Sequence, residues 1–158
     1  MNDFACVRID DRLIHGQIIV SWVTALGITE IIVADTDAAN DEFQGMLLEM
    51  GVPKAMKFEL LTLEEAGNLI NSNRDFSKTL LIVRDIHSLK TLMDLGVSFS
   101  TVNYGNSGRT DSRTRYYKSV WLTEDERKLV ESVMDAGVTL EVRVIPSEKA
   151  VDMRTLLK

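Results

Sequence analysis

Short apolar runs alternate with helical patterns along almost the whole chain. Several runs are β-branched at consecutive positions, as in Ile31-Ile32-Val33, which is typical of strands buried on both faces. The pattern predicts strands at Phe4–Ile9, Glu30–Ala34, Lys57–Leu61, Thr79–Val83, Ser100–Val102, Ser119–Leu122 and Thr139–Val144.

Helical periods fill the gaps between these runs. Over Leu13–Leu26 the apolar residues fall on one stripe, and Gly27 provides a C-cap. Thr62 and Thr123 each open a capping box. Further helices are predicted at Asp41–Met50, at Leu63–Asn71, from Asp85 or Ser88 to Gly96, from Thr123 to Gly137, and after Pro146-Ser147.

Strands separated by helices of this length favour right-handed crossovers and a parallel arrangement. We therefore expect an α/β fold, an open, mainly parallel twisted sheet with helices on both faces, formed by residues 1–158 as a single domain. The stretch from Gly105 to Lys118 lacks a helical period, and it is predicted to be a loop or hairpin at the sheet edge.

Composition narrows the functional classes. A net charge of −6 argues against a nucleic-acid-binding protein, and the lone Cys6 excludes an internal disulfide or a cysteine-based zinc site. Charged residues within twelve positions of the start argue against a signal peptide, and no run approaches the ~18 apolar residues of a membrane span. We therefore expect a soluble intracellular protein.

The densest group of polar side chains follows the first strand. The run Arg8-Ile-Asp-Asp-Arg12-Leu-Ile-His15-Gly-Gln17 leads directly into the first helix. Histidine is a nucleophile near neutral pH, and a helix N-terminus offers unpaired N–H groups to a phosphate. Gly16 allows close approach, Arg8 and Arg12 suit phosphoryl oxygens, and Asp10 or Asp11 suits the imidazole N–H.

Plainer interpretations of the same residues stay open. A lone loop histidine is often only a surface residue, and Arg8 and Arg12 equally suit ion pairs with Asp10, Asp11 or Asp35. His87 is best explained as a surface residue at a helix start. The chain contains no GxGxxG, GxxxxGK[ST], HExxH or GxSxG motif, so nucleotide-binding, zinc-protease and serine-hydrolase functions lose their strongest support.

The run from Arg8 to Gln17, followed by Trp22, resembles the signature of the IIB subunits of the mannose/fructose/sorbose family of the bacterial phosphoenolpyruvate-dependent sugar phosphotransferase system. The similarity extends over essentially the whole chain. It includes Ile31–Asp35, Val102–Asn106, Leu122–Asp125 and Gly137–Ser147.

The resemblance implies a phosphocarrier, a protein-N(pi)-phosphohistidine–sugar phosphotransferase. His15 would accept a phosphoryl group from a IIA phosphohistidine and pass it to a sugar held by the membrane subunits IIC and IID. Arg12 and the backbone of Ile14, Gly16 and Gln17 would hold the phosphate, and Asp10 would support the loop. The resemblance implies no metal and no cofactor, and the protein would be cytoplasmic, associated with the inner membrane face through IIC and IID.

Some questions stay open at this level. A non-catalytic regulatory domain, with His15 as a phosphorylation switch, would carry the same loop, and a homo-oligomer is compatible with the sequence. The chain also departs from the family pattern: Ser112-Arg113 stands where members often have a Gly-Lys or Gly-Arg step, and Tyr104 and Ser107-Gly108 are unusual.

Arg109, Arg113, Arg115 and Lys118 form a local basic block. It is explained either by a solvated edge loop or by a surface beside His15 that docks IIA.

Overall fold

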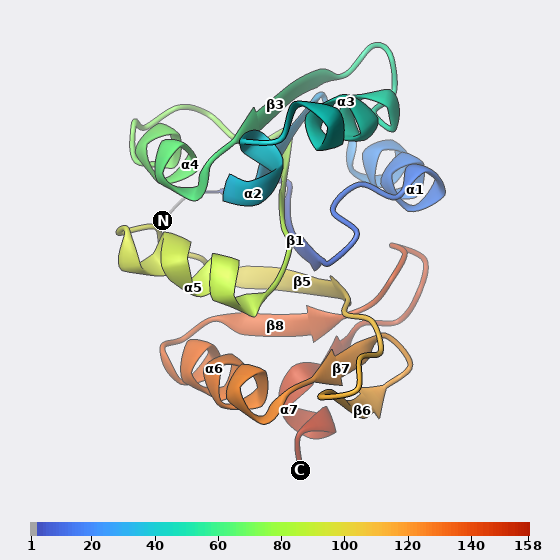
Figure 1. Ribbon diagram of the computed structural model, residues 1–158, viewed down its shortest axis with the longest axis vertical. Helices are drawn as coiled ribbons and strands as arrows, with labels where there is room; N and C mark the ends of the chain where they lie inside the picture. The colour runs from blue at the N-terminus through green and yellow to red at the C-terminus, as the bar shows by residue number, and fades with distance from the viewer. Residues whose placement is uncertain (1–2) are drawn as a thin grey trace.

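A computed structural model describes residues 3–158, which form a seven-stranded open sheet and a separate two-stranded hairpin (Figure 1). All neighbouring strands are parallel except the last pair, so the predicted open, mainly parallel sheet is confirmed. Across the sheet the order is β3 (Lys57–Leu61), β2 (Glu30–Ala34), β4 (Thr79–Val83), β1 (Cys6–Asp10), β5 (Thr101–Asn106), β8 (Thr139–Val142) and β9 (Val151–Asp152).

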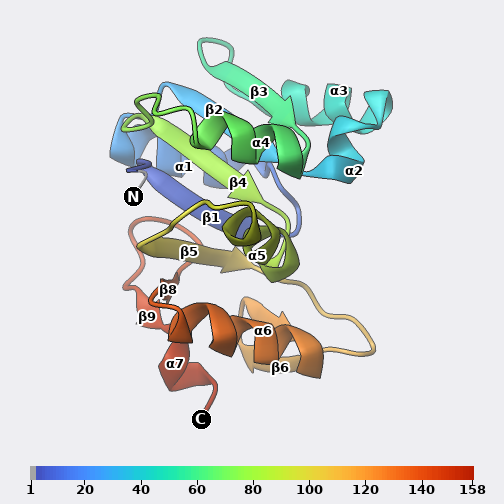
Figure 2. The same ribbon diagram turned by 90° about the vertical axis from the view of Figure 1, so that its left-hand side faces the viewer.

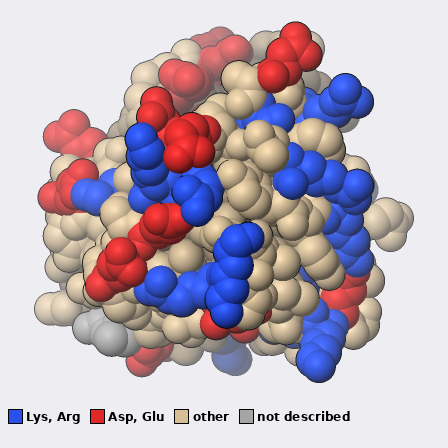
Figure 3. Space-filling model, turned by 90° about the horizontal axis from the view of Figure 1, so that it is seen from below, with Lys and Arg blue, Asp and Glu red and all other residues tan. Residues whose placement is uncertain are grey.

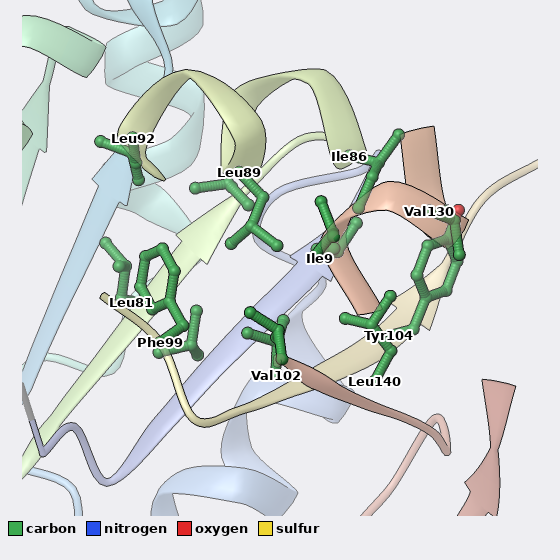
Figure 4. Close-up of a cluster of buried hydrophobic side chains, with 14 of the residues drawn as sticks. Ile9, Leu81, Ile86, Leu89, Leu92, Phe99, Val102, Tyr104, Val130 and Leu140 are labelled. Carbon is green, nitrogen blue, oxygen red and sulfur yellow. The ribbon is translucent and has the colours of Figure 1, made fainter. Parts of the chain in front are cut away.

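Helices cover both faces of this sheet. One buried cluster joins a sheet face to α1 (Gly16–Leu26), α2 (Thr36–Ala39) and α3 (Glu42–Met50). The larger cluster joins the other face to α4 (Leu63–Ile70), α5 (Ile86–Asp94), α6 (Glu124–Asp135) and α7 (Met153–Leu156). Figure 2 shows how the sheet twists from β3 to β8, and Figure 4 shows side chains of α5 and α6 packed on this second face: Leu89, Leu92 and Val130 against Leu81, Val102 and Leu140.

Most of these elements lie where apolar runs and capping residues in the sequence predict them. All residues of β2 and β4 are buried, as their β-branched and leucine-rich runs predict. Both capping boxes form, with Thr62 and Thr123 accepting from the N–H groups of Glu65 and Glu126. Gly27 ends α1 in the left-handed conformation, at φ +63°.

The structure departs from the predicted elements in four places. β5 extends to Asn106, beyond the predicted end at Val102, because the residues that continue it are polar or small and give no strand pattern in the sequence. The predicted loop or hairpin after Gly105 is a hairpin, β6 (Thr114–Tyr117) paired antiparallel with β7 (Val120–Leu122), but it forms a separate two-stranded sheet and not the edge of the main one. The short α2 was not predicted. After Pro146-Ser147 the chain first adds β9, and helix α7 begins only at Met153.

Within residues 3–158, no helix is long and apolar enough to cross a membrane. Figure 3 views the end of the molecule opposite β3. Acidic and basic side chains are interspersed over much of this face, with Lys and Arg predominating on its right side.

The sheet topology fixes where a site can form. The connection after β1 leads through α1 toward β2, whereas the connection after β5 leads the opposite way, toward β8. Ligands of open α/β sheets bind at the carboxyl ends of strands where the direction of connection reverses. Here that point lies between the ends of β1 and β5, at Asp10 and Asn106.

Candidate functional site

His15 lies directly after this switch point, as the N-cap residue of α1. It is exposed, as are its neighbours Gly16 and Gln17. The predicted helix from Leu13 therefore begins three residues later, and the first residues of that prediction form the loop that carries the imidazole. An exposed nucleophile at a helix start is accessible to another protein.

The N-terminus of α1 differs from those of the other described helices. His15 has extended backbone angles (φ −126°, ψ 110°), its side chain caps no N–H group, and the first turn contains no acidic residue. The other six helices are each capped by the side chain of an N-terminal residue: Asp35, Asp41, Thr62, Asp85, Thr123 and Asp152. The first N–H groups of α1 therefore remain available to an anion beside His15.

Asp10, at the end of β1, holds the His15 loop through hydrogen bonds to two arginines. Its carboxylate accepts hydrogen bonds from the Arg12 backbone N–H (3.0 Å), from Arg12 Nε and Nη2 (both 2.9 Å), and from Arg8 Nη2 (3.1 Å). The hydrogen bond to Asp10 is the main reason why the pKa of Arg12 is raised. Because Asp10 is buried and pairs with two guanidinium groups, its negative charge is offset within the loop.

Arg12 is oriented by this pairing. Its side chain is 35% exposed, and the edge formed by Nε and Nη2 is occupied by Asp10. The other edge of the guanidinium, at Nη1, donates no hydrogen bond to the described residues and is free to bind an anion. The structure thus keeps Arg12 in the loop with its position fixed by a second residue.

The prediction that Arg8 binds phosphate is wrong. Its side chain is fully buried, and its guanidinium donates to Asp10, to Asn103 Oδ1 (2.6 Å) and to the Arg143 carbonyl (3.4 Å). It lies 5.6 Å from the centre of the Trp22 ring. Burial lowers the pKa of Arg8, and Asp10 opposes this shift. Arg8 therefore supports Asp10 and cannot reach a phosphate.

Gly105 makes room for Arg8. A Cβ atom at position 105 would lie 2.3 Å from the Arg8 guanidinium carbon, so any larger residue would force the buried Arg8 side chain to shift. Together with Trp22 and Asn103, it forms the cradle of the buried arginine. The sequence analysis did not predict this role of Asn103 and Gly105. An asparagine and a glycine inside a buried strand, next to a strand that contains an arginine, could have indicated it.

Asp11 points away from His15 into the following loop. It accepts from Asn106 Nδ2 (2.9 Å) and the Gly108 N–H (2.7 Å), with Arg113 Nη1 at 3.5 Å. Its carboxylate therefore attaches the loop before the β6–β7 hairpin to the His15 loop. A role for Asp11 in orienting the imidazole does not fit these contacts.

The basic block predicted as a docking surface divides into two kinds of residue. Arg113 is 14% exposed, and its Nε and Nη2 bind both carboxylate oxygens of Glu126 (3.0 and 2.9 Å). It is a structural residue and not a free surface charge. Arg109 lies over the Trp121 ring, and Arg115 is exposed on β6; neither has an acidic partner within residues 3–158.

Packing on both sides holds the loop in a strained backbone conformation. Leu13 has a positive φ of 61°, which a leucine rarely adopts, and its side chain is buried in the cluster beneath α1. Such a conformation costs of order 1–3 kcal/mol and persists only where the surrounding packing imposes it. Ile14 packs against Gly51 at the end of α3. The loop is therefore anchored on both sides of its turn.

Arg84, which the sequence analysis did not single out, lies at the same sheet edge. It follows β4, pairs with Asp35 through Nε (3.1 Å) and Nη2 (3.0 Å), and points Nη1 at the Asp11 carbonyl (3.4 Å). Its position directly after a buried strand could have indicated a residue at this edge. Arg84 adds a further positive charge beside the His15 loop.

Two other reactive side chains lie away from this edge. His87 is exposed on α5, on the opposite face of the sheet from α1. Burial raises the pKa of the Cys6 thiol to about 12, so it is not a nucleophile at neutral pH. Within the described residues no group of three or more His, Cys, Asp or Glu side chains is arranged to hold a metal ion.

Comparison with known proteins identifies the family. The profile described as PTS system sorbose subfamily IIB component matches residues 4–158. The fructose-specific EIIB component of Bacillus subtilis is 32% identical over 100% of this chain and 98% of its own length. The mannose-specific EIIAB component of Escherichia coli is 24% identical over 99% of this chain, which spans half of that protein.

A solved structure supports the same assignment. The IIB domain of the sorbose permease from Klebsiella pneumoniae superposes with a TM-score of 0.90, at 28% identity, covering 98% of this chain and 96% of that one. Sequence and fold therefore agree over nearly the full length of the chain. The chain belongs to the sorbose subfamily of IIB components of the sugar phosphotransferase system.

Proposed function

We propose that this protein is a phosphocarrier that takes a phosphoryl group on His15 from a phosphohistidine of a IIA partner and passes it to a sugar. The observation that carries the proposal is the exposed His15 at the only described helix N-terminus without a side-chain cap. An uncapped helix start beside a nucleophile supplies both parts of a phosphohistidine site, an attacking nitrogen and donors for the phosphoryl oxygens.

The chemistry is a transfer between two imidazoles. A ring nitrogen of His15 attacks the phosphorus, the new P–N bond forms, and the bond to the donor imidazole nitrogen breaks. The charge on the three phosphoryl oxygens is met by the N–H groups of Gly16 and Gln17 and by Arg12. In the second step a sugar hydroxyl attacks phosphorus, its proton is released, and His15 leaves as the free imidazole.

The donor and acceptor are proposed from the family. The relative named EIIAB joins a IIA and a IIB component in one protein, which favours a IIA domain as the donor. The exposed Arg109 and Arg115, fastened to the His15 loop through Asp11 and Gly108, suit docking of a negatively charged phospho-IIA. We place the protein at the inner face of the membrane, where IIC and IID would hold the sugar.

The acceptor residue is tested by intact mass after incubation with phosphoenolpyruvate, the general phosphocarriers and a IIA domain. One phosphoryl group, labile in acid and stable in alkali, is expected on the wild type and on His87→Ala, and none on His15→Ala. Full labelling of His15→Ala would show that another residue is the acceptor.

A regulatory domain would be phosphorylated in the same way, so a second measurement separates it from a carrier. The phosphorylated protein is mixed with membrane vesicles that contain the cognate IIC and IID subunits and with fructose, sorbose or mannose. A carrier loses its phosphoryl group to one of the sugars. Retention of the phosphoryl group with every sugar would favour the regulatory role.

A further inference from the structure

Helix α3 presents its large apolar side chains to solvent. Phe43, Met46, Leu47 and Met50 are 65%, 53%, 50% and 76% exposed, and their spacing of i, i+3, i+4 and i+7 places them on one face of the helix. We call these four residues the α3 stripe. Contiguous exposed apolar surface of this kind marks a contact with another molecule more often than a free surface.

The inner face of α3 explains why the stripe points outward. Gly45 lies against Leu60, and Gly51 lies against Ile14, so closely that a Cβ atom would be 3.2 Å and 3.0 Å from those side chains. Between them only Leu48 is buried. The helix is therefore packed on the molecule through small residues, and its bulky residues lie on the side that no part of residues 3–158 covers.

The stripe also lies next to the His15 loop. Met50 and Gly51 end α3, and Gly51 contacts Ile14, the residue before His15. Figure 1 shows α3 and the β6–β7 hairpin on opposite sides of the connection between β1 and α1. A partner seated on the α3 stripe would thus reach His15 from the side away from Arg109 and Arg115.

Charge separates the partners that suit the two sides. Between Leu13 and Pro53 the chain contains no Lys or Arg, and the exposed acidic residues near the stripe are Asp37, Asp41, Glu42 and Glu49. The exposed Lys54 shares a surface hollow with Glu49 at the end of α3, so acidic residues outnumber basic ones around the stripe. An acidic rim repels a phosphorylated donor and an anionic lipid surface. It attracts a basic protein surface, and the cytoplasmic loops of membrane proteins are enriched in Lys and Arg.

We infer that the α3 stripe and its acidic rim form the docking surface for the cytoplasmic side of the membrane-embedded IIC and IID subunits. This rests on the proposed phosphocarrier function. The donor would approach over the basic hairpin and the acceptor over α3. The flexible methionines of the stripe suit packing into an apolar groove bordered by basic residues.

The test uses the double variant Phe43→Gln with Met50→Gln, since both side chains are exposed and glutamine is a good helix former. The control is Leu95→Gln, a 42% exposed leucine after α5 on the other sheet face. The first readout is co-sedimentation of the unphosphorylated protein with vesicles containing the cognate IIC and IID. Vesicles from cells lacking both subunits, and protein-free vesicles of anionic phospholipid, are compared.

Loss of two apolar anchors should weaken binding to the IIC and IID vesicles, and discharge of phospho-His15 to sugar, by about tenfold or more, whereas Leu95→Gln retains both. Phosphorylation by IIA should stay within about twofold of the wild type in each variant. The donor is expected to dock on the hairpin side of His15, where none of the substituted residues lies. Glu42→Gln with Glu49→Gln should weaken vesicle binding at low salt more than at high salt.

Four results would overturn the inference. Wild-type binding and discharge in the stripe variant would remove the surface from the acceptor step, and a matching loss of phosphorylation by IIA would assign it to the donor. Binding to lipid alone, or a wild-type dimer that the stripe variant dissociates, would identify a different occupant. If the wild type is never phosphorylated on His15, the proposed function fails, while vesicle binding still reports on α3.

Discussion

At the scale of single residues, the two arginines of the first loop illustrate what sequence alone can and cannot show. Arg8 and Arg12 are four positions apart and look equivalent in the sequence. In the structure Arg8 is fully buried on β1, while Arg12 lies 35% exposed in the loop. Strand alternation could not reveal this difference, because it depends on Trp22, Asn103 and Gly105, which come from two other elements.

Arg12 is held by Asp10 through Nε and Nη2, a geometry that a lysine cannot reproduce. Arg12→Lys keeps the positive charge but loses this orientation and the remaining guanidinium edge. Losing one charged contact in the transition state costs ~2–4 kcal/mol, so phosphorylation by IIA should slow by roughly 30- to 1000-fold. Rapid-quench measurement of phospho-His15 formation checks this, and a wild-type rate would limit Arg12 to a structural role.

Gly105 offers a test of the buried support beneath the loop. In Gly105→Ala the new methyl group would overlap the Arg8 guanidinium, which must shift together with Asp10. Overpacking of this kind costs about 1–3 kcal/mol, so the variant should unfold at lower denaturant concentration and accept phosphate more slowly.

The matched control is Gly16→Ala, since nothing lies within 4 Å of its Cβ position. It should retain the stability of the wild type. Equal stability of Gly105→Ala and the wild type would contradict the tight fit around Arg8.

At the scale of elements, local signals predicted those whose ends are set by nearby residues. The helices with capping boxes and the buried strands β2 and β4 lie where they were predicted. β5 and β9 could not be delimited in this way. β5 includes Asn103 and Gly105, which accept a hydrogen bond from Arg8 and leave room for its side chain. β9 is a two-residue strand held by pairing with β8. Both depend on contacts distant in sequence.

The β6–β7 hairpin is fastened to α6 by the pair between Arg113 and Glu126. Burial raises the pKa of Glu126, but hydrogen bonds from Arg113 and the Thr123 backbone outweigh this, so its pKa lies below the ordinary 4.5. A lowered carboxyl pKa contributes stability above the unfolded value, and that contribution is lost as the pH falls through the folded value.

Glu126→Gln should therefore be less stable than the wild type near neutral pH, and the difference should shrink below pH 4.5. Denaturant unfolding across this range measures it. Asp125→Gln is a suitable control, because Asp125 is an exposed carboxylate on the same helix and forms no ion pair with the described residues. A difference that is constant with pH would show that Arg113 does not stabilise the Glu126 carboxylate.

At the scale of the whole molecule, charge is distributed unevenly around the His15 loop. The hairpin side carries Arg109 and Arg115, while the α1–α3 side carries no Lys or Arg between Leu13 and Pro53. The sequence predicted the basic block, but it could not show which of its residues are paired with a carboxylate and which are not. The structure removes Arg113 from this set, so a charge-reversal test has to exclude it in order to leave the fold intact.

Arg109→Glu with Arg115→Glu should slow phosphorylation by IIA at low salt and much less at high salt, because steering is screened over ~8 Å at physiological ionic strength. Lys128→Glu with Lys158→Glu makes the same change of charge on α6 and at the C-terminus, and should have little effect. Initial rates at two ionic strengths provide the measurement. Equal rates for the two double variants at low salt would show that the hairpin is only a solvated edge.

The missing cap of α1 bears on the energy with which the phosphoryl group is carried. A phosphoryl group on His15 would take the place of the absent cap, which in other helices is worth about 1 kcal/mol. Because 1.4 kcal/mol corresponds to a tenfold change in equilibrium, this gain shifts the exchange with the donor by less than about tenfold. The group would thus retain most of its transfer potential, and transfer between the two histidines would remain reversible, with sugar phosphorylation supplying the downhill step.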